Sequence, residues 1–309
     1  MQSAMIVGQQ VLIMFLLMVV GMYSRRTNML TEDAARCCST FLLNVALPCS
    51  MIASLYVEKK PHLLPGFVLA VALGAVMHTI GVISAKLFIK ERPGEMCHAE
   101  RFALVFANSA YMAIPLVTAV LGEEAAFYPV AFVTMFQTFH WTYGVIELGG
   151  TVNPAKLLKN PCIISVFLGF ALFWFQIPIP SPVMGTVRLL GGLTSSLSMI
   201  IAGVFLADVK ISDMRGRNMY FLAFLRCLAV PMVIVALLYF SGVSNWFEGA
   251  KVPVMASLYC YACPSAVSVI LMSASLGKDA VYPSKLVALT TVISLICLPL
   301  ISAIAEILL

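Results

Sequence analysis

The chain has 309 residues and a formal net charge of +5; 61% of its residues are hydrophobic and only 11% are charged. This composition excludes an ordinary soluble domain, in which about 25% of residues are charged. It indicates a protein that crosses a membrane several times. The basic residues lie in short loops between apolar segments, so the positive charge does not indicate binding to nucleic acid.

Ten apolar segments follow one another along the chain. A membrane-spanning helix needs about 20 mostly apolar residues, and the segments that approach this length are 4–23, 35–57, 63–89, 101–121, 125–148, 160–178, 182–208, 218–240, 250–276 and 280–308. The first is too long for a signal-peptide core and has no basic residues ahead of it, so we expect it to be retained. We therefore predict an all-α polytopic membrane protein with ten transmembrane helices.

The positions of Lys and Arg predict how these helices are oriented. Of 19 such residues, 14 lie in or beside the loops after the first, third, fifth, seventh and ninth segments, and four lie on the opposite side. Because cytoplasmic loops carry the excess of basic residues, the first set is predicted to be cytoplasmic. We expect a multi-pass protein of the cell membrane with both termini extracytoplasmic.

Two of the segments are interrupted by proline and polar residues. The fourth contains the run from Asn108 to Pro115, and the ninth contains the run from Cys260 to Ser265. Proline removes a helical hydrogen bond and clashes with the preceding turn. Such interruptions are tolerated at membrane depth where they are buried in protein or line a wet cavity, and a matching pair points to a transporter's substrate site. The alternative is two proline-kinked core helices.

The two halves of the chain share a repeated motif after each interruption. The run Leu-Gly-Glu-Glu-Ala-Ala-Phe-Tyr-Pro occupies 121–129, and Leu-Gly-Lys-Asp-Ala-Val-Tyr-Pro occupies 276–283. Each half would contain five spans, an odd number, so the second half must insert in the opposite orientation. This pattern predicts two inverted repeats, residues 1–150 and 151–309, as in many secondary transporters.

A few polar residues within the apolar segments are candidates for function. Arg226 needs a carboxylate, a carbonyl cluster or an anionic substrate, unless it reaches the cytoplasmic interface. His78 is either a proton carrier or a neutral, hydrogen-bonded histidine. Gln137 and His140 share a helical face that is predicted to line a cavity, and Asn44 belongs to a third polar break.

The sequence gives no indication of catalysis or of a cofactor. It contains no P-loop, no Ser/His/Asp array and no metal-ligand cluster, and Cys260-x-x-Cys263 has neither a partner pair nor a nearby histidine. We expect no enzyme activity, no cofactor and no metal site.

Several of these runs resemble the auxin efflux carrier family, which includes plant auxin carriers and bacterial malate or malonate permeases. The runs that carry the resemblance are Asn108 to Leu116, Leu121 to Ala125, Gln137 to Gly144, Arg226 to Pro231, Ala262 to Ala266 and Thr291 to Pro299. The similarity covers essentially the whole chain. Ala113 departs from the glycine that many relatives have there, and the absence of the long cytoplasmic loop of plant members favours a bacterial-type member.

The resemblance implies a fold related to bile acid/sodium symporters and sodium/proton antiporters. In that fold the fourth and ninth spans are broken and cross. The first, second, sixth and seventh spans form a scaffold, and the third to fifth and eighth to tenth form a transport domain that moves as an elevator. The substrate would lie among residues of the two breaks and of the facing scaffold: Asn108, Ser109, Tyr111, Pro115, Cys263, Pro264, Ser265 and Asn44.

These features together predict a secondary active or facilitative transporter of small organic anions such as malate, malonate or auxin-like acids. Half-helix N-termini at the breaks would attract an anion. The fourth and ninth spans have no mid-span carboxylate to bind sodium, which leaves proton coupling through His78 or His140, or uncoupled flux. The alternatives are a sodium-coupled carrier like the bile acid symporters and a non-transporting receptor. The sequence is also compatible with a homodimer.

Overall fold

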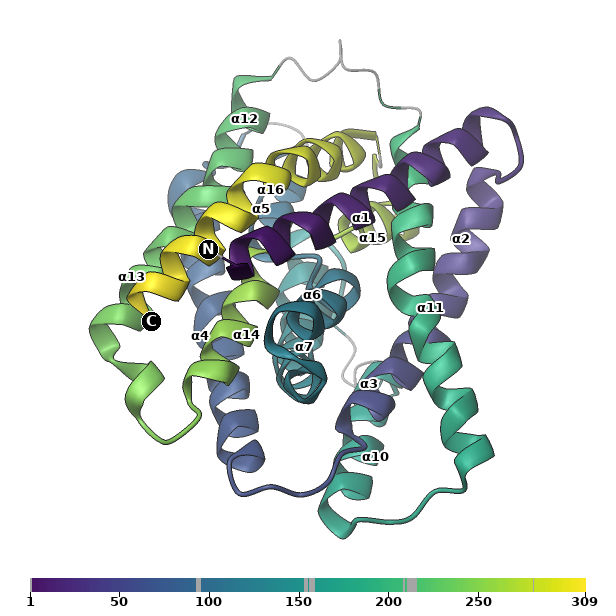
Figure 1. The fold of residues 1–309 in the computed structure, drawn as a ribbon. Coiled ribbons are helices and arrows are strands. Elements are labelled where there is room, and N and C mark those ends of the chain that lie inside the picture. Colours follow the sequence, from purple (N-terminus) through teal and green to yellow (C-terminus); the bar gives the residue numbers. More distant parts are fainter. Residues whose placement is uncertain are drawn as a thin grey trace.

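The computed structural model describes residues 2–92, 96–152, 155, 159–207, 209, 216–279 and 281–309, and this part of the chain is helical (Figure 1). Some residues used in the orientation and repeat arguments lie outside the described residues: Lys156, Lys210, Arg215 and Ala280.

Six helical segments in the described residues are long and apolar enough to cross a membrane. They are α1 (Gln2–Arg26); α2 (Glu32–Phe41) with η1 (Leu42–Ala46) and α3 (Leu47–Leu55); α4 (Leu63–Phe88); α11 (Ser181–Leu206); α12 (Arg217–Phe224) with η6 (Leu225–Ala229) and α13 (Val230–Ser241); and α16 (Val281–Leu308). The prediction of an all-α, multi-pass membrane protein is confirmed.

The other predicted spans consist of shorter helices. These are α5 (Met96–Val105), η2 (Ser109–Ala113), α6 (Ile114–Leu121), η3 (Glu123–Ala126), α7 (Phe127–Phe139), η4 (His140–Gly144), α8 (Val145–Glu147), α10 (Pro161–Phe175), α14 (Lys251–Ala262) and α15 (Ser268–Ser275), with the short turn η7 (Val243–Asn245). The fourth predicted span is divided between α5 and α6, and the ninth between α14 and α15. Both predicted interruptions are therefore present.

Four π-helical turns, η1, η2, η4 and η6, interrupt the described helices. Three of them run directly into a helix whose second residue is proline, namely Pro48, Pro115 or Pro231. Proline offers no N–H to the carbonyl four residues earlier and its ring crowds that turn, which accounts for the local widening. Such turns are frequent at functional sites, and each of the four carries a residue that the sequence singled out.

The helices can be described as two groups, which contact each other through α1 against α16 and α6. In one, α11 packs against α1, α2 and α3, and α10 packs against α3; in the other, α4 packs against α7 and α14, and α16 packs against α5 and α12. Glycine allows α1 and α11 to touch, because a Cβ on Gly203 would lie 2.0 Å from the Met18 carbonyl oxygen and one on Gly21 would lie 2.0 Å from that of Ile200. Small residues permit close helix packing in membranes.

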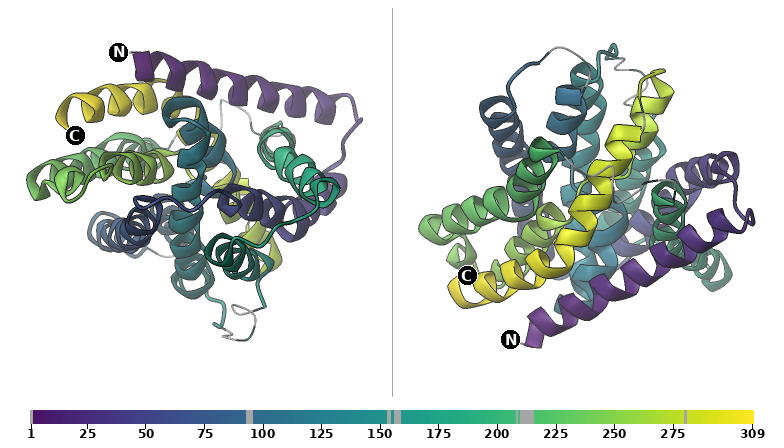
Figure 2. Two further views of the ribbon diagram at one scale, coloured as in Figure 1. Left: turned by 60° about the horizontal axis from the view of Figure 1, so that its bottom comes forward. Right: turned by 90° about the horizontal axis from the view of Figure 1, so that it is seen from above.

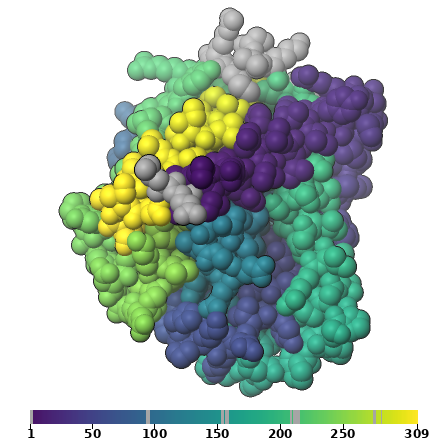
Figure 3. All heavy atoms as spheres, in the orientation of Figure 1, coloured from purple at the N-terminus to yellow at the C-terminus, as the bar shows by residue number. Residues whose placement is uncertain are grey.

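Helices α6 and α7 lie in the middle of the molecule, with the long helices around them (Figures 1 and 2). Helix α1 runs alongside α16 and also contacts α6 and α11. On the face shown in Figure 3, the surface is recessed between α6 and α11, below α1. This arrangement puts the first helix break between the two groups.

Candidate functional site

The two helix breaks lie directly against each other. The Asn108 N–H donates to the Pro264 carbonyl oxygen at 2.7 Å, and the Ala266 N–H donates to the Phe106 carbonyl oxygen at 2.9 Å. These bonds form an isolated antiparallel bridge between Ala107 and Ser265. Backbone groups that are unwound inside a membrane protein need such partners, because hydrocarbon offers none. The two interrupted segments, more than a hundred residues apart in sequence, thus share one centre.

Ser265 fixes this centre to neighbouring helices. Its N–H donates to Oγ1 of Thr290 on α16 at 3.2 Å, and its hydroxyl donates to the Ala103 carbonyl oxygen of α5 at 2.8 Å. The side chain is fully buried. Its hydroxyl is therefore committed to the protein, although the sequence suggested it as a substrate ligand.

A cavity of about 310 Å³, which we call the break cavity, opens beside the crossing segments. Polar side chains predicted from the sequence line it: Asn44, Asn108, Tyr111, Gln137 and His140. They come from η1, the first break, η2, α7 and η4. The structure therefore gathers residues from the first break, from η1 of the second predicted span and from the α7–η4 helix around one space.

Two of the residues around the break cavity have polar side-chain groups with no hydrogen-bond partner among the described residues. Both ring nitrogens of His140 are buried and unpaired, as is the Ser268 hydroxyl at the start of α15. Buried polar groups are costly unless they are satisfied, so these groups are available to a ligand. Among the described residues that line the break cavity, none is Asp, Glu, Lys or Arg.

Helix ends supply the electrostatic field of the break cavity. The helical run from Ser109 begins at it, and so does α15 at Ser268. The first N–H groups of a helix have no intrahelical partner, and the N-terminal end carries about half a positive charge. The described side chains that line the break cavity therefore carry no formal charge, while the positive ends of two helix dipoles point at it. This combination suits an anion.

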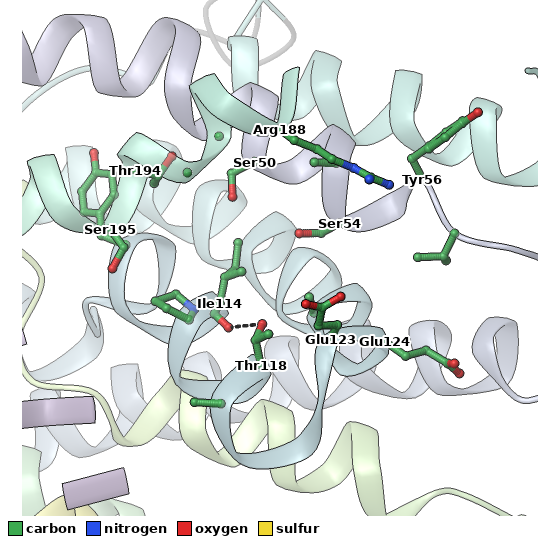
Figure 4. A pocket seen from close by; sticks show the side chains of 18 of the residues that line it. Ser50, Ser54, Tyr56, Ile114, Thr118, Glu123, Glu124, Arg188, Thr194 and Ser195 are labelled. Atoms are coloured by element: carbon green, nitrogen blue, oxygen red, sulfur yellow. Dashed lines mark hydrogen bonds between the residues drawn. The ribbon is translucent and has the colours of Figure 1, made fainter. Parts of the chain in front are cut away.

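A second and larger cavity, which we call the large cavity, lies between α3, α6 and α11 and has a volume of about 960 Å³. Figure 4 shows Ser50 and Ser54 of α3 and Ser195 of α11 on one side, with Ile114 and Thr118 of α6 opposite them. Pro115 lines this cavity rather than the break cavity. Ala110 and Tyr111 line both cavities, so the first break separates the two spaces.

Charged residues gather at one end of the large cavity. Arg188 of α11 points over Ser54 toward Tyr56, and Glu123 lies below it (Figure 4). Lys60 and His62 both contact the carboxylate of Glu124. The hydrogen bond from Lys60 holds the pKa of the Glu124 carboxyl below its usual range. This rim was not among the predicted site residues.

Arg226 lies behind the crossing segments and is fully buried. Its Nη1 donates to the Leu104 carbonyl oxygen at 3.1 Å, and its Nη2 donates to the carbonyl oxygens of Tyr261 at 2.5 Å and Cys263 at 2.8 Å. Its guanidinium also lies 4.7 Å from the centre of the Tyr261 ring. The sequence left a carboxylate, a carbonyl cluster and an anionic substrate open as partners of Arg226. In the structure, its partners are a cluster of carbonyl oxygens.

His78 lies outside both cavities. Its side chain is fully buried, and Nδ1 bonds to the Gly74 carbonyl oxygen of the same helix at 2.7 Å. The rings of Phe132 and Phe139 lie 5.1 and 5.3 Å from the imidazole. The structure therefore favours a packed histidine over a group in contact with substrate.

The remaining predicted residues support the backbone of the breaks. The Ser109 hydroxyl is fully buried and donates to the Ala107 carbonyl oxygen at 3.5 Å. Cys263 presents its carbonyl to Arg226, and its thiol donates to the Tyr259 carbonyl oxygen at 3.2 Å. Pro264 accepts the Asn108 N–H. None of these three side chains lines the break cavity.

The sequence did not single out Asn160 and Ser268 as residues of the break cavity. Asn160 is the N-cap of α10, where its Oδ1 accepts from the Cys162 N–H at 2.8 Å. Asparagine followed by Pro161 is a recognisable helix start, but this signal marks a cap and not a site. Ser268 carries no signal beyond its nearness to the second break.

Comparison with known proteins identifies the family. A family model described as membrane transport protein matches residues 6–155 and 150–302, nearly the whole chain. The chain belongs to the membrane transport protein family. This is the auxin efflux carrier family that the sequence motifs resemble. Membership in this family makes the protein a membrane transporter, a class whose activity is generally not enzymatic. No curated protein matches the chain.

Proposed function

We propose that the protein is a secondary transporter of small organic anions, such as malate, malonate or auxin-like acids, and that the break cavity binds them. The observation that carries this proposal is the combination of two helix N-termini and five predicted polar side chains, with no carboxylate among the described residues that line the cavity. A volume of about 310 Å³ lies at the lower end of the ~300–1,000 Å³ range of small-molecule sites. A compact carboxylate fits such a space better than a steroid does.

Asn108, Gln137 and Ser268 are the proposed hydrogen-bond donors to the carboxylate. Their side chains can donate to an oxygen anion without bringing a competing negative charge. Tyr111 lines both cavities, so its side chain is placed to contact substrate arriving from either side. Asn44 would approach from the other packed group of helices.

Transport would follow an elevator mechanism. In this proposal ten spans form inverted repeats, residues 1–150 and 151–309, with both termini extracytoplasmic. The group containing α1, α3, α10 and α11 is the scaffold, and the close α1–α11 contact at Gly21 and Gly203 supports its rigidity. The group containing both breaks would carry the anion past it.

We further propose that a proton accompanies the anion at His140. His140 lines the break cavity, and neither of its ring nitrogens bonds to another residue that the structure describes. A protonated imidazole would bind the carboxylate directly, and it would give up its proton to the water on the side where the anion is released. His78 is a weaker candidate because it lies outside both cavities.

A ligand screen by thermal shift tests the proposed binding. Purified protein would be heated with malate, malonate, indole-3-acetate, a bile acid and the amide analogue malonamide. Binding to the native state raises the unfolding temperature by mass action. Stabilisation by at least one small carboxylate, and none by malonamide, is expected. Stabilisation by the bile acid alone, and only in sodium, would favour the symporter-like alternative instead.

A further inference from the structure

Two helix C-termini meet behind the substrate break. Helix α5 ends at Val105 and α14 ends at Ala262, and both run into the paired segments. The last carbonyls of a helix lack intrahelical partners, and that end carries about half a negative charge. Two such ends inside a membrane protein need a cation. In transporters with discontinuous helices, these carbonyls and helix ends are where a coupling ion binds.

The guanidinium of Arg226 already lies at this position. It contacts Leu104 from the last turn of α5 and both Tyr261 and Cys263 at the end of α14. Among the described residues no carboxylate forms an ion pair with it, so the carbonyls and the Tyr261 ring are its polar environment. Because a guanidinium stays protonated at any physiological pH, its charge cannot leave.

The helix that carries Arg226 widens at this residue. The residue lies in the π-helical turn η6, and Pro231 follows at the second position of α13. The widened turn is fixed by this proline and by the contact of the Cys227 thiol with the Thr290 carbonyl oxygen at 3.4 Å. Thr290 also accepts the Ser265 N–H. The guanidinium and the second break are therefore held by one connected set of contacts.

We infer that Arg226 is a resident cation that takes the place of a coupling ion, so that this carrier works without sodium. The inference rests on the proposed function, since it concerns which ions accompany the anion. A sodium ion at the same carbonyls would find them occupied and would be repelled by a fixed positive charge. Arg226 is a positioning residue. It holds the C-terminal ends of α5 and α14 together and leaves the N-terminal ends of the other two half-helices, at Ser109 and Ser268, for the substrate.

The test is [14C]malonate uptake into proteoliposomes in sodium, potassium or N-methylglucamine chloride. Wild-type uptake is expected to agree within twofold among the three salts. A tenfold or greater requirement for sodium would overturn the inference while leaving anion transport intact. Absence of uptake of malonate, malate or indole-3-acetate in every salt would instead remove the proposed function.

An Arg226→Ala variant adds a second readout. We expect at least a tenfold loss of uptake that 10 mM guanidinium chloride partly restores and 10 mM urea does not, because guanidinium can refill the carbonyl cluster. An Arg226→Ala protein that folds and takes up substrate at the wild-type rate without any added cation would overturn the inference. If this variant does not fold, binding of ²²Na⁺ by the wild type decides: no saturable binding is expected, and saturable binding that malonate enhances would refute the inference.

Discussion

Replacing Asn108 with alanine removes a polar group from the break cavity without removing a bond that holds the fold. The main-chain N–H and carbonyl of Asn108 bond to Pro264 and Met112, and alanine keeps both. The side-chain amide does not cap the following π-helical turn, and no hydrogen bond joins it to another described residue. The substitution therefore separates substrate binding from stability.

The expected effect follows from the loss of one hydrogen bond to a charged ligand. Such a bond contributes about 1.5–3 kcal/mol. Since each 1.4 kcal/mol is tenfold in affinity, the dissociation constant for malonate is expected to rise by about 10- to 150-fold. The unfolding temperature without ligand is expected to stay within about 2 °C of the wild type, since a larger shift would mean a loss of roughly 1 kcal/mol of stability.

The assay is a thermal-shift titration of the wild type, Asn108→Ala and a matched control, Asn218→Ala. Asn218 is an exposed asparagine on α12 outside the break cavity. The control should bind malonate with wild-type affinity. Wild-type affinity in Asn108→Ala, measured on a protein of unchanged stability, would refute the assignment of Asn108 to the substrate.

Three further predictions address coupling and stability. His140→Gln is expected to remove the stimulation of uptake by an inward proton gradient while leaving malonate exchange measurable; unchanged stimulation in proteoliposomes would exclude His140 as the proton carrier. Gly203→Ala is expected to destabilise the protein by about 1–3 kcal/mol, because the new Cβ would overlap the α1 backbone. Gly185→Ala on the same helix is the control and should not destabilise it, because a Cβ there would have no atom within 4 Å. Equal melting temperatures for the two variants would contradict close α1–α11 packing at Gly203. Glu124→Gln is expected to cost at most about 1 kcal/mol, because the contact with Lys60 is partly exposed and screened by salt. The pKa of Glu124 is lowered in the fold, so this stabilisation is present above the unfolded pKa and lost as the pH falls through the folded pKa. The difference in melting temperature between the wild type and Glu124→Gln should therefore shrink as the pH falls. A difference that grew on acidification would contradict this expectation.

The sequence predicted the positions of the helix breaks because proline acts locally. Pro115 and Pro264 lie in the two predicted interruptions, where the structure divides the helix, and proline lacks the N–H that a continuous helix requires. The polar residues beside these prolines were expected to be buried or to line a cavity, since hydrocarbon would not solvate them.

Which polar residues face the cavity could not be predicted in the same way. A π-helical turn holds an extra residue, and each residue of a helix rotates the facing side by about 100°, so the helical face of Gln137 and His140 cannot be extended through η4. Ser265 is a separate case outside the helices: it lies at the second break, yet its hydroxyl is bonded to Ala103 on α5.

The partners of Arg226 also lay beyond what the sequence could specify. They belong to α5 and α14, whose contacting residues are 122, 35 and 37 positions away in the chain. Local pattern predicts that a buried arginine needs acceptors; it does not predict which distant carbonyls converge on it. Only the crossing of the two breaks brings these acceptors together.

The most direct test of the account is flux of a labelled small carboxylate into proteoliposomes that contain the purified protein. A transporter of small organic anions should show saturable [14C]malonate or [14C]malate uptake that requires the protein, is competed by unlabelled carboxylates and is strongly reduced by Asn108→Ala. Binding of these anions without any movement across the bilayer would contradict it, and would indicate a receptor in place of a carrier.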